Sequence, residues 1–125
     1  MKGFNRNDSS ELGFAVACLF HGAITLNEFH RWVESVLVMS SEVSPLLVDL
    51  LDFNGPMTRI FKVIGFVPDW PFPIEAKAAL LAIAYQRGTP PEDCKISSTE
   101  AEEIRNRFPQ VETRFKEMFP FANIC

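Results

Sequence analysis

The chain has 125 residues and a formal net charge of −4, and 47% of its residues are hydrophobic. This length suits one domain with its own core, so we expect a single helical domain over residues 1–125, with residues 1–8 as a loose N-terminal segment. The acidic balance excludes the basic surface that binds a phosphate backbone, and the sequence lacks the ~18-residue apolar run of a membrane span. We therefore expect neither a nucleic-acid partner nor a membrane partner.

The first helix is predicted between a polar cap at residues 8–10 and a stop at Gly22. Its apolar residues recur at the three- and four-residue spacing of one buried face, at Leu12, Ala15, Val16, Leu19 and Phe20. The stretch "AVAC" at residues 15–18 is similar to the end of a bacterial lipoprotein signal. Because Asp8 and Glu11 stand where such a signal needs apolar residues, a buried helix is the better interpretation.

A second helix is predicted to begin at Thr25 and Glu28, which have the spacing of a capping box. Its apolar stripe is Leu26, Phe29, Val33, Val36 and Met39, with Trp32 on the flank. His30 falls on the opposite, polar face, where we expect it to be solvated. His21 falls in the last turn of the preceding helix, where an imidazole suits the carbonyl end of the helix dipole.

Two short helices are predicted next. Residues 44–45, Ser-Pro, read as the N-cap and first residue of a third helix, whose leucines point inward. Asp49 and Asp52 then point toward solvent. A fourth helix begins after Pro56 and ends at Gly65.

The stretch "FVPDWPFP" at residues 66–73 interrupts this regularity. Three prolines in it exclude a helix and remove hydrogen-bond donors, so we expect an ordered, extended connector. Two interpretations of its aromatic residues stay open. In the first, the aromatic residues are rigid anchors for a partner. In the second, Trp70 and Phe72 fold back and cover the core.

The remaining residues predict further helices. Residues 73–87 form a fifth helix with a buried, alanine-rich stripe, ended by Gly88. Thr99 and Glu102 resemble another capping box, and Pro109 divides the rest into a sixth helix and a last amphipathic segment. Strand signals are nearly absent. The predicted fold is therefore all-α, an irregular bundle of six to seven short helices.

The sequence contains no recognised catalytic or phosphate-binding motif, such as HExxH, GxSxG or GxxxxGK[ST]. Its three cysteines are Cys18, Cys94 and Cys125. They lack zinc-site spacing and are odd in number, which favours reduced thiols in a cytoplasmic protein. We expect no catalytic, cofactor-binding or metal-binding residues. The alternative, a small metal-binding or enzymatic helical domain, would have to use His21, His30 and Glu34.

Acidic residues gather in two regions. Those of the second and third helices and their link are Glu34, Glu42, Asp49 and Asp52, and those of the later loop and helix are Glu92, Asp93, Glu100, Glu102 and Glu103. These residues either keep a surface solvated and stabilise nearby helix N-termini, or they form a surface complementary to a basic protein.

The order of features in residues 10–53 resembles small helical proteins of bacterial toxin–immunity loci. The features are the turn Gly22-Ala23-Ile24-Thr25, then Glu28-Phe29 with Trp32, then a helix led by Pro45 with Leu47, Asp49 and Leu50. The later stretch "AALLAIAYQRG" is similar to another helix of these proteins. The resemblance implies an immunity protein of a contact-dependent growth inhibition or polymorphic toxin system. Such a protein binds a cognate toxin domain, often a nuclease, and blocks its active site or substrate surface.

The resemblance does not indicate which residues contact the toxin. We therefore predict the contact residues from their chemistry, as acidic residues that point outward and an aromatic residue held on a rigid connector. They are Asp49, Asp52, Asp69, Trp70, Glu92 and Asp93. The expected partner is a basic toxin domain. The alternative is a helical adaptor or regulatory domain that binds a protein without inhibiting it.

Overall fold

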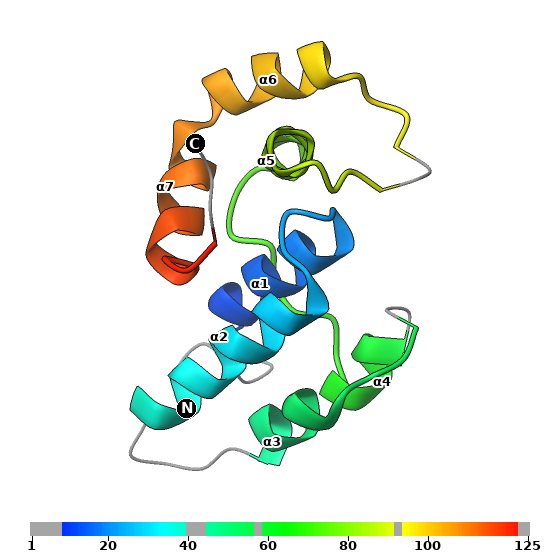
Figure 1. Ribbon diagram of the computed structural model, residues 1–125, viewed down its shortest axis with the longest axis vertical. Helices are drawn as coiled ribbons and strands as arrows, with labels where there is room; N and C mark the ends of the chain where they lie inside the picture. Colours follow the sequence, from blue (N-terminus) through cyan, green and yellow to red (C-terminus); the bar gives the residue numbers. More distant parts are fainter. Residues whose placement is uncertain (1–8, 40–44, 57–58, 92–93, 123–125) are drawn as a thin grey trace.

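The computed structural model describes residues 9–39, 45–56, 59–91 and 94–122, and within them it contains helices and no strand. The α-helices are α1 (Ser10–Phe20), α2 (Leu26–Met39), α3 (Pro45–Asp52), α4 (Ile60–Ile64), α5 (Ala78–Arg87), α6 (Ser98–Arg107) and α7 (Pro109–Met118), and a 3-10 helix, η2 (Ile74–Lys77), precedes α5. The predicted all-α bundle of short helices is confirmed (Figure 1). No helix in these ranges is long and apolar enough to cross a membrane.

The central element is α1, which lies between α5 on one side and α2 and α4 on the other (Figure 1). Every residue from Leu12 to Leu19 is buried. The sequence predicts one buried face, but Gly13, Phe14, Ala17 and Cys18 on the other faces are also uncharged and buried, so the helix is buried all round. Most buried apolar residues of the other helices belong to the same core as α1, whereas Ala101 of α6 packs in a second cluster with Leu81 and Ala82 of α5.

The predicted helix ends are confirmed where glycine stops a helix. Gly22, Gly65 and Gly88 all have positive φ, a conformation that costs other residues energy. At Gly22 a side chain would also meet a neighbour, because a Cβ there would lie 2.4 Å from the carbonyl oxygen of Thr89. This turn therefore fixes both the end of α1 and its distance from the segment that follows α5.

One predicted cap is wrong, and another has the predicted position, within residues 8–10, without the capping hydrogen bond. Ser9 precedes α1, yet its hydroxyl makes no cap hydrogen bond and instead accepts one from the backbone N–H of Asp69, at 2.9 Å. The N-cap of α6 is Ser97, whose hydroxyl accepts from the N–H of Glu100, rather than Thr99. In both cases several neighbouring polar residues could cap the helix, and packing decides between them.

The ends of two other predicted helices also differ. The fifth helix begins with the 3-10 turn η2 rather than with α-helix. Met39 is 87% exposed at the end of α2 although it was placed on the buried stripe, and Trp32, placed on the flank, is buried. The core beneath α2 ends before Met39, so the helix extends past it. The predicted cap Ser44 lies outside the described residues.

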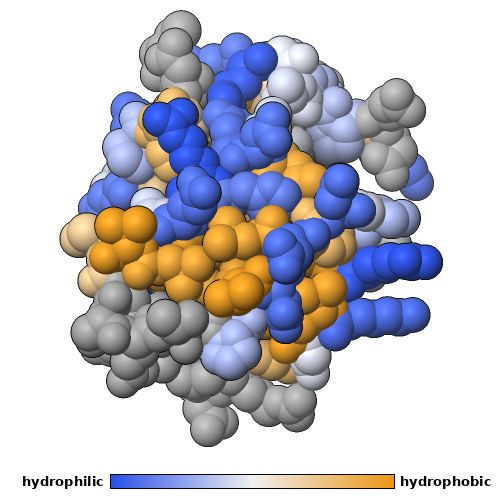
Figure 2. Space-filling view, turned by 60° about the horizontal axis from the view of Figure 1, so that its bottom comes forward, coloured by the Kyte–Doolittle hydropathy of each residue, from blue (hydrophilic) through white to orange (hydrophobic). Residues whose placement is uncertain are grey.

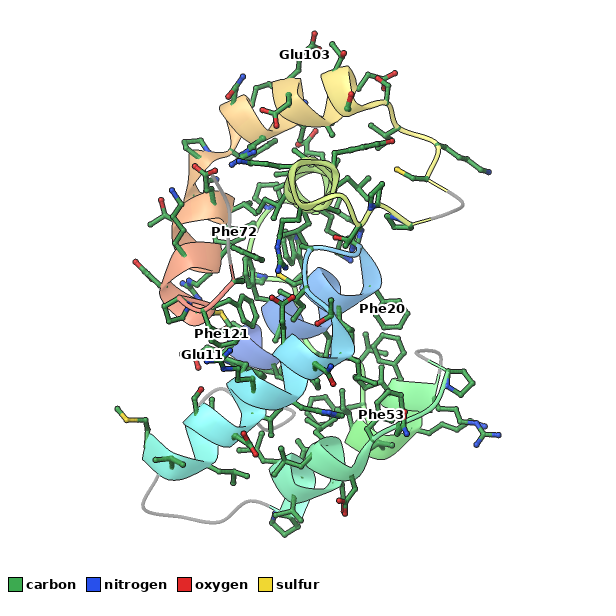
Figure 3. All side chains as sticks on the ribbon, in the orientation of Figure 1. Glu11, Phe20, Phe53, Phe72, Glu103 and Phe121 are labelled. Atoms are coloured by element: carbon green, nitrogen blue, oxygen red, sulfur yellow. The ribbon has the colours of Figure 1, made fainter. Side chains whose placement is uncertain are left out.

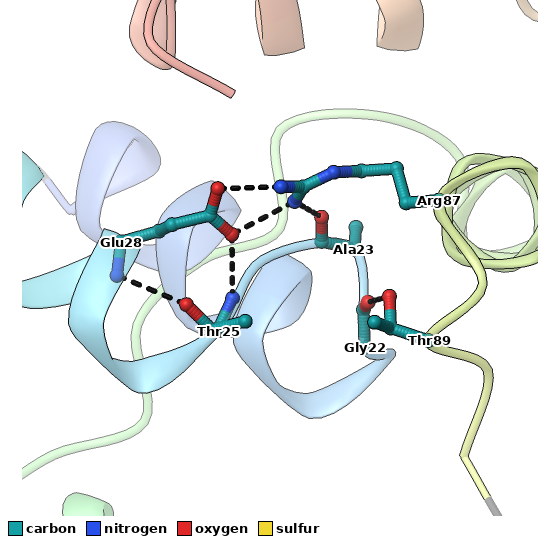
Figure 4. A network of polar contacts seen from close by, with 6 residues as sticks. All are labelled: Gly22, Ala23, Thr25, Glu28, Arg87 and Thr89. Carbon is teal, nitrogen blue, oxygen red and sulfur yellow. Dashed lines mark hydrogen bonds and ion pairs between the residues drawn. The ribbon is translucent and has the colours of Figure 1, made fainter. Parts of the chain in front are cut away.

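A polar network joins the turn between α1 and α2 to the end of α5 (Figure 4). The capping box is confirmed: the N–H of Thr25 donates to the Glu28 carboxylate at 2.8 Å, and the N–H of Glu28 donates to the Thr25 hydroxyl at 3.2 Å. The Arg87 guanidinium donates to both Glu28 carboxylate oxygens, at 2.8 and 2.5 Å, and to the carbonyl of Ala23. One carboxylate thus caps α2 and holds α5 in place.

We expect Glu28→Gln to lower the free energy of unfolding at pH 7 by about 1–2 kcal/mol, because it weakens a largely buried, charge-assisted pair. Burial raises the pKa of the Glu28 carboxyl, but the hydrogen bonds from Arg87 and Thr25 and the charge of Arg87 outweigh it, so this pKa lies below its ordinary value. The stabilisation is therefore present above the unfolded-state pKa and is lost as the pH falls through the folded-state pKa.

Urea denaturation of the wild type and of Glu28→Gln at pH 7 and at pH 3.5 tests this account. The difference between the two proteins should shrink at the lower pH. Glu34→Gln, on an exposed position of the same helix, is the control and should change stability by less than about 0.5 kcal/mol. A difference that is the same at both pH values contradicts the assigned role of the Glu28 charge.

Candidate functional site

The predicted contact residues that the structure describes lie on both sides of α4. Asp49 and Asp52 are exposed on α3, and the connector at residues 66–73 places Asp69 at the surface and Trp70 half-buried. Asp49 and Asp52 line one hollow, and Trp70 lines another. Residues of α4 line both hollows. Residues 92–93, the predicted contacts Glu92 and Asp93, lie outside the described residues.

The first hollow, here called the α3–α4 hollow, has a volume of about 550 Å³. Its lining residues are Asp49, Asp52, Phe53, Asn54, Gly55, Arg59, Lys62 and Val63. Two carboxylates thus share a shallow depression with two cations. Sequence reasoning missed Arg59 and Lys62, because their position opposite α3 depends on how α4 packs. The hollow therefore offers both signs of charge to a partner and is not a uniformly acidic surface.

The second hollow, here called the connector pocket, has a volume of about 270 Å³ and lies among α1, α4, η2 and the connector. Its lining residues are Gly13, Val16, Ala17, Phe20, His21, Phe61, Val67, Pro68, Trp70 and Lys77. Phe20 and Phe61 stack on each other, with ring centroids 5.3 Å apart, and Figure 3 shows Phe20 on the side of α1 that faces α4. Its walls are thus mainly apolar, and none of its lining residues is acidic.

The connector is held firmly against α1. The Trp70 ring stacks on the buried ring of Phe14, with centroids 5.5 Å apart and planes 5° from parallel. The rings of Trp70 and Phe72 meet edge to face, with their centroids 5.6 Å apart. The Trp70 indole N–H donates to the carbonyl of Pro73 at 2.8 Å. The interpretation in which these aromatics cover the core is therefore confirmed. Trp70 also lines the connector pocket, so the same ring closes the core and forms a surface wall.

His21 lies at the end of α1, as predicted, and lines the connector pocket. Its Nδ1 donates to the carbonyl of Ala17 at 2.8 Å. Burial lowers the pKa of His21, the bond to Ala17 raises it, and the nearby charge of Lys77 lowers it, with a net shift below the ordinary value. The imidazole is therefore neutral at pH 7.

The prediction that His30 is solvated is wrong. Its Nε2 donates to the carbonyl of Phe53 at 2.8 Å, in a partly buried contact that joins α2 to the end of α3. His21 instead donates to a carbonyl of α1, and Glu34 is exposed. Across the described ranges, no three His, Cys, Asp or Glu side chains gather where they could hold a metal ion. The structure does not bring His21, His30 and Glu34 together.

An apolar band crosses the face of the molecule that carries α3. Figure 2 shows it in orange, between hydrophilic side chains, on the face that lies at the bottom of Figure 1. The exposed apolar side chains that α2 and α3 contribute are Val38, Met39 and Val48, which are 83%, 87% and 40% exposed. Exposed apolar surface of this kind is typical of protein interaction sites.

Comparison with known proteins identifies no relative: no protein-family model, curated protein or solved structure matches the chain.

Proposed function

We propose that this protein is an immunity protein, which binds a cognate toxin domain and neutralises it by covering the active site or substrate surface. The observation that carries the proposal is that α2 and α3 expose apolar side chains, Val38, Met39 and Val48, and that α3 also exposes the carboxylates of Asp49 and Asp52. Exposed valine and methionine side chains supply area that a partner can bury, and adjacent carboxylates select a partner with basic groups. A nuclease domain has such groups, because it binds phosphates.

The charges of the α3–α4 hollow refine the expected partner. Asp49 and Asp52 attract basic side chains, whereas Arg59 and Lys62, which line the same hollow, attract acidic ones. Since like charges placed opposite each other are costly, this arrangement favours one orientation of the bound toxin. The hollow therefore favours a partner surface that places basic groups against Asp49 and Asp52 and at least one carboxylate against Arg59 and Lys62.

Reversing the two charges on α3 tests the location of the interface. We expect the double variant Asp49→Lys/Asp52→Lys to bind the toxin domain about tenfold more weakly than the wild type, mainly through slower association. We expect the toxin domain to be encoded directly upstream of the gene, and that domain, purified in an inactive form, is the partner used; the absence of such a gene would contradict the proposal. Surface plasmon resonance at two salt concentrations measures both rates, and the difference should shrink at high salt.

The matched control is Glu100→Lys/Glu103→Lys, which changes the net charge equally on exposed positions of α6. Figure 3 shows Glu103 at the opposite end of the molecule from α3. This variant should bind with nearly the wild-type affinity. Equal losses in both double variants would show that net charge alone matters, and would reject the α3 interface.

A further inference from the structure

We propose that the connector pocket is a binding site for a small organic acid that has one apolar ring or branched chain and a single carboxylate. This site goes beyond the proposed function and does not depend on it. The acid's apolar part lies against the aromatic walls, and its carboxylate pairs with the ammonium group of Lys77.

The size and walls of the pocket define the apolar part. Its volume of about 270 Å³ lies just below the ~300–1,000 Å³ range of drug-sized ligand sites, which suits a small molecule with one ring. Phe20 and Phe61 provide stacked aromatic surface, and Trp70 is fixed by its contact with Phe14. The walls are therefore formed before a ligand arrives, so little ordering is needed on binding.

The charge of the pocket defines the polar part. In a chain with 16 acidic residues, the pocket is lined by none, and its charged residue is Lys77. The Lys77 ammonium lies 5.9 Å from the centre of the Trp70 ring, and no carboxylate of the described chain pairs with it. Its position beside an apolar cavity therefore favours a carboxylate over a neutral or cationic group.

Three ligands with the same ring and different charge test this inference: phenylacetate, phenylacetamide and 2-phenylethylamine. Each is titrated into ¹⁵N-labelled protein at pH 7, with the indole N–H signals of the two tryptophans as readouts. Trp70 lines the pocket, whereas Trp32 is buried and does not, so only the Trp70 signal should shift. We expect phenylacetate to bind with a Kd on the order of 1 mM. Phenylacetamide should bind about fivefold more weakly, and 2-phenylethylamine more weakly still.

Lys77→Gln should remove the preference for phenylacetate over phenylacetamide, while phenylacetamide binding stays within about twofold of the wild type. Lys62→Gln, a matched change in the α3–α4 hollow, should retain the preference. An unchanged Trp32 signal in each variant shows that the core is folded. Equal binding of the acid and the amide by the wild type, a preference retained in Lys77→Gln, or no shift of Trp70 would each overturn the proposal.

Discussion

Replacing Phe14 with Ala is expected to lower the free energy of unfolding by about 3–5 kcal/mol, the largest effect of any substitution considered. The Phe14 ring is fully buried in α1, and its removal deletes the surface on which Trp70 stacks, together with the edge contact to Phe72 at 6.1 Å. The substitution therefore leaves a cavity and also loosens the connector that forms one wall of the pocket.

Urea denaturation measures the loss, and the Trp70 indole signal reports whether the connector has moved. Val67→Ala is the control, because Val67 is in the same connector and is 77% exposed. It should change stability by no more than about 0.5 kcal/mol. A loss for Phe14→Ala below about 1 kcal/mol would contradict the contact between the connector and α1.

The second large effect is expected for Gly13→Ala. A Cβ at Gly13 would lie 1.7 Å from the carbonyl oxygen of Asp69, and since that atom is backbone, the connector itself would have to move. Such overpacking costs about 3 kcal/mol at the upper end of its usual range, whereas Ala is favoured over Gly in a helix by about 1 kcal/mol. We therefore expect a net loss of about 2 kcal/mol.

Gly55→Ala makes the same chemical change where no neighbouring atom lies within 4 Å of the new Cβ. It should be neutral or slightly stabilising, because it reduces the freedom of the unfolded chain. Thermal unfolding of both variants beside the wild type gives the comparison. If Gly13→Ala is as stable as Gly55→Ala, the backbone of the connector does not lie against α1.

Features set by neighbouring residues were predictable from the sequence. The end of α1 at Gly22 and the capping box of Thr25 and Glu28 depend on residues within one turn of each other, and the structure contains both. The outward positions of Asp49 and Asp52 follow from helical periodicity in the same way.

Features that join distant segments were not predictable. The bond between Ser9 and Asp69 spans 60 residues, and the bond between His30 and Phe53 spans 23. Each depends on the packing of whole helices, and the pattern of a single sequence gives no signal for it. The helical pattern alone therefore predicts neither the bond from Asp69 to the Ser9 hydroxyl nor the partly buried contact of His30.

The residues of the candidate site also fall into a predictable group and an unpredictable one. Its acids and its aromatic connector were identified by residue type, but the cations that share their hollows were not. Arg59 and Lys62 line the same hollow as Asp49 and Asp52 because α4 packs beside α3. Lys77 of η2 lies over the ring of Trp70 in the connector and lines the same pocket. The mixed charge of the α3–α4 hollow and the cationic character of the connector pocket are therefore tertiary properties.

The proposed immunity function is tested most directly by the growth of bacteria that express the upstream toxin domain together with this protein. We predict that the wild type restores growth, that Asp49→Lys/Asp52→Lys restores it less well at equal protein levels, and that Glu100→Lys/Glu103→Lys restores it fully. Continued growth inhibition in cells that contain the folded wild-type protein would contradict the account.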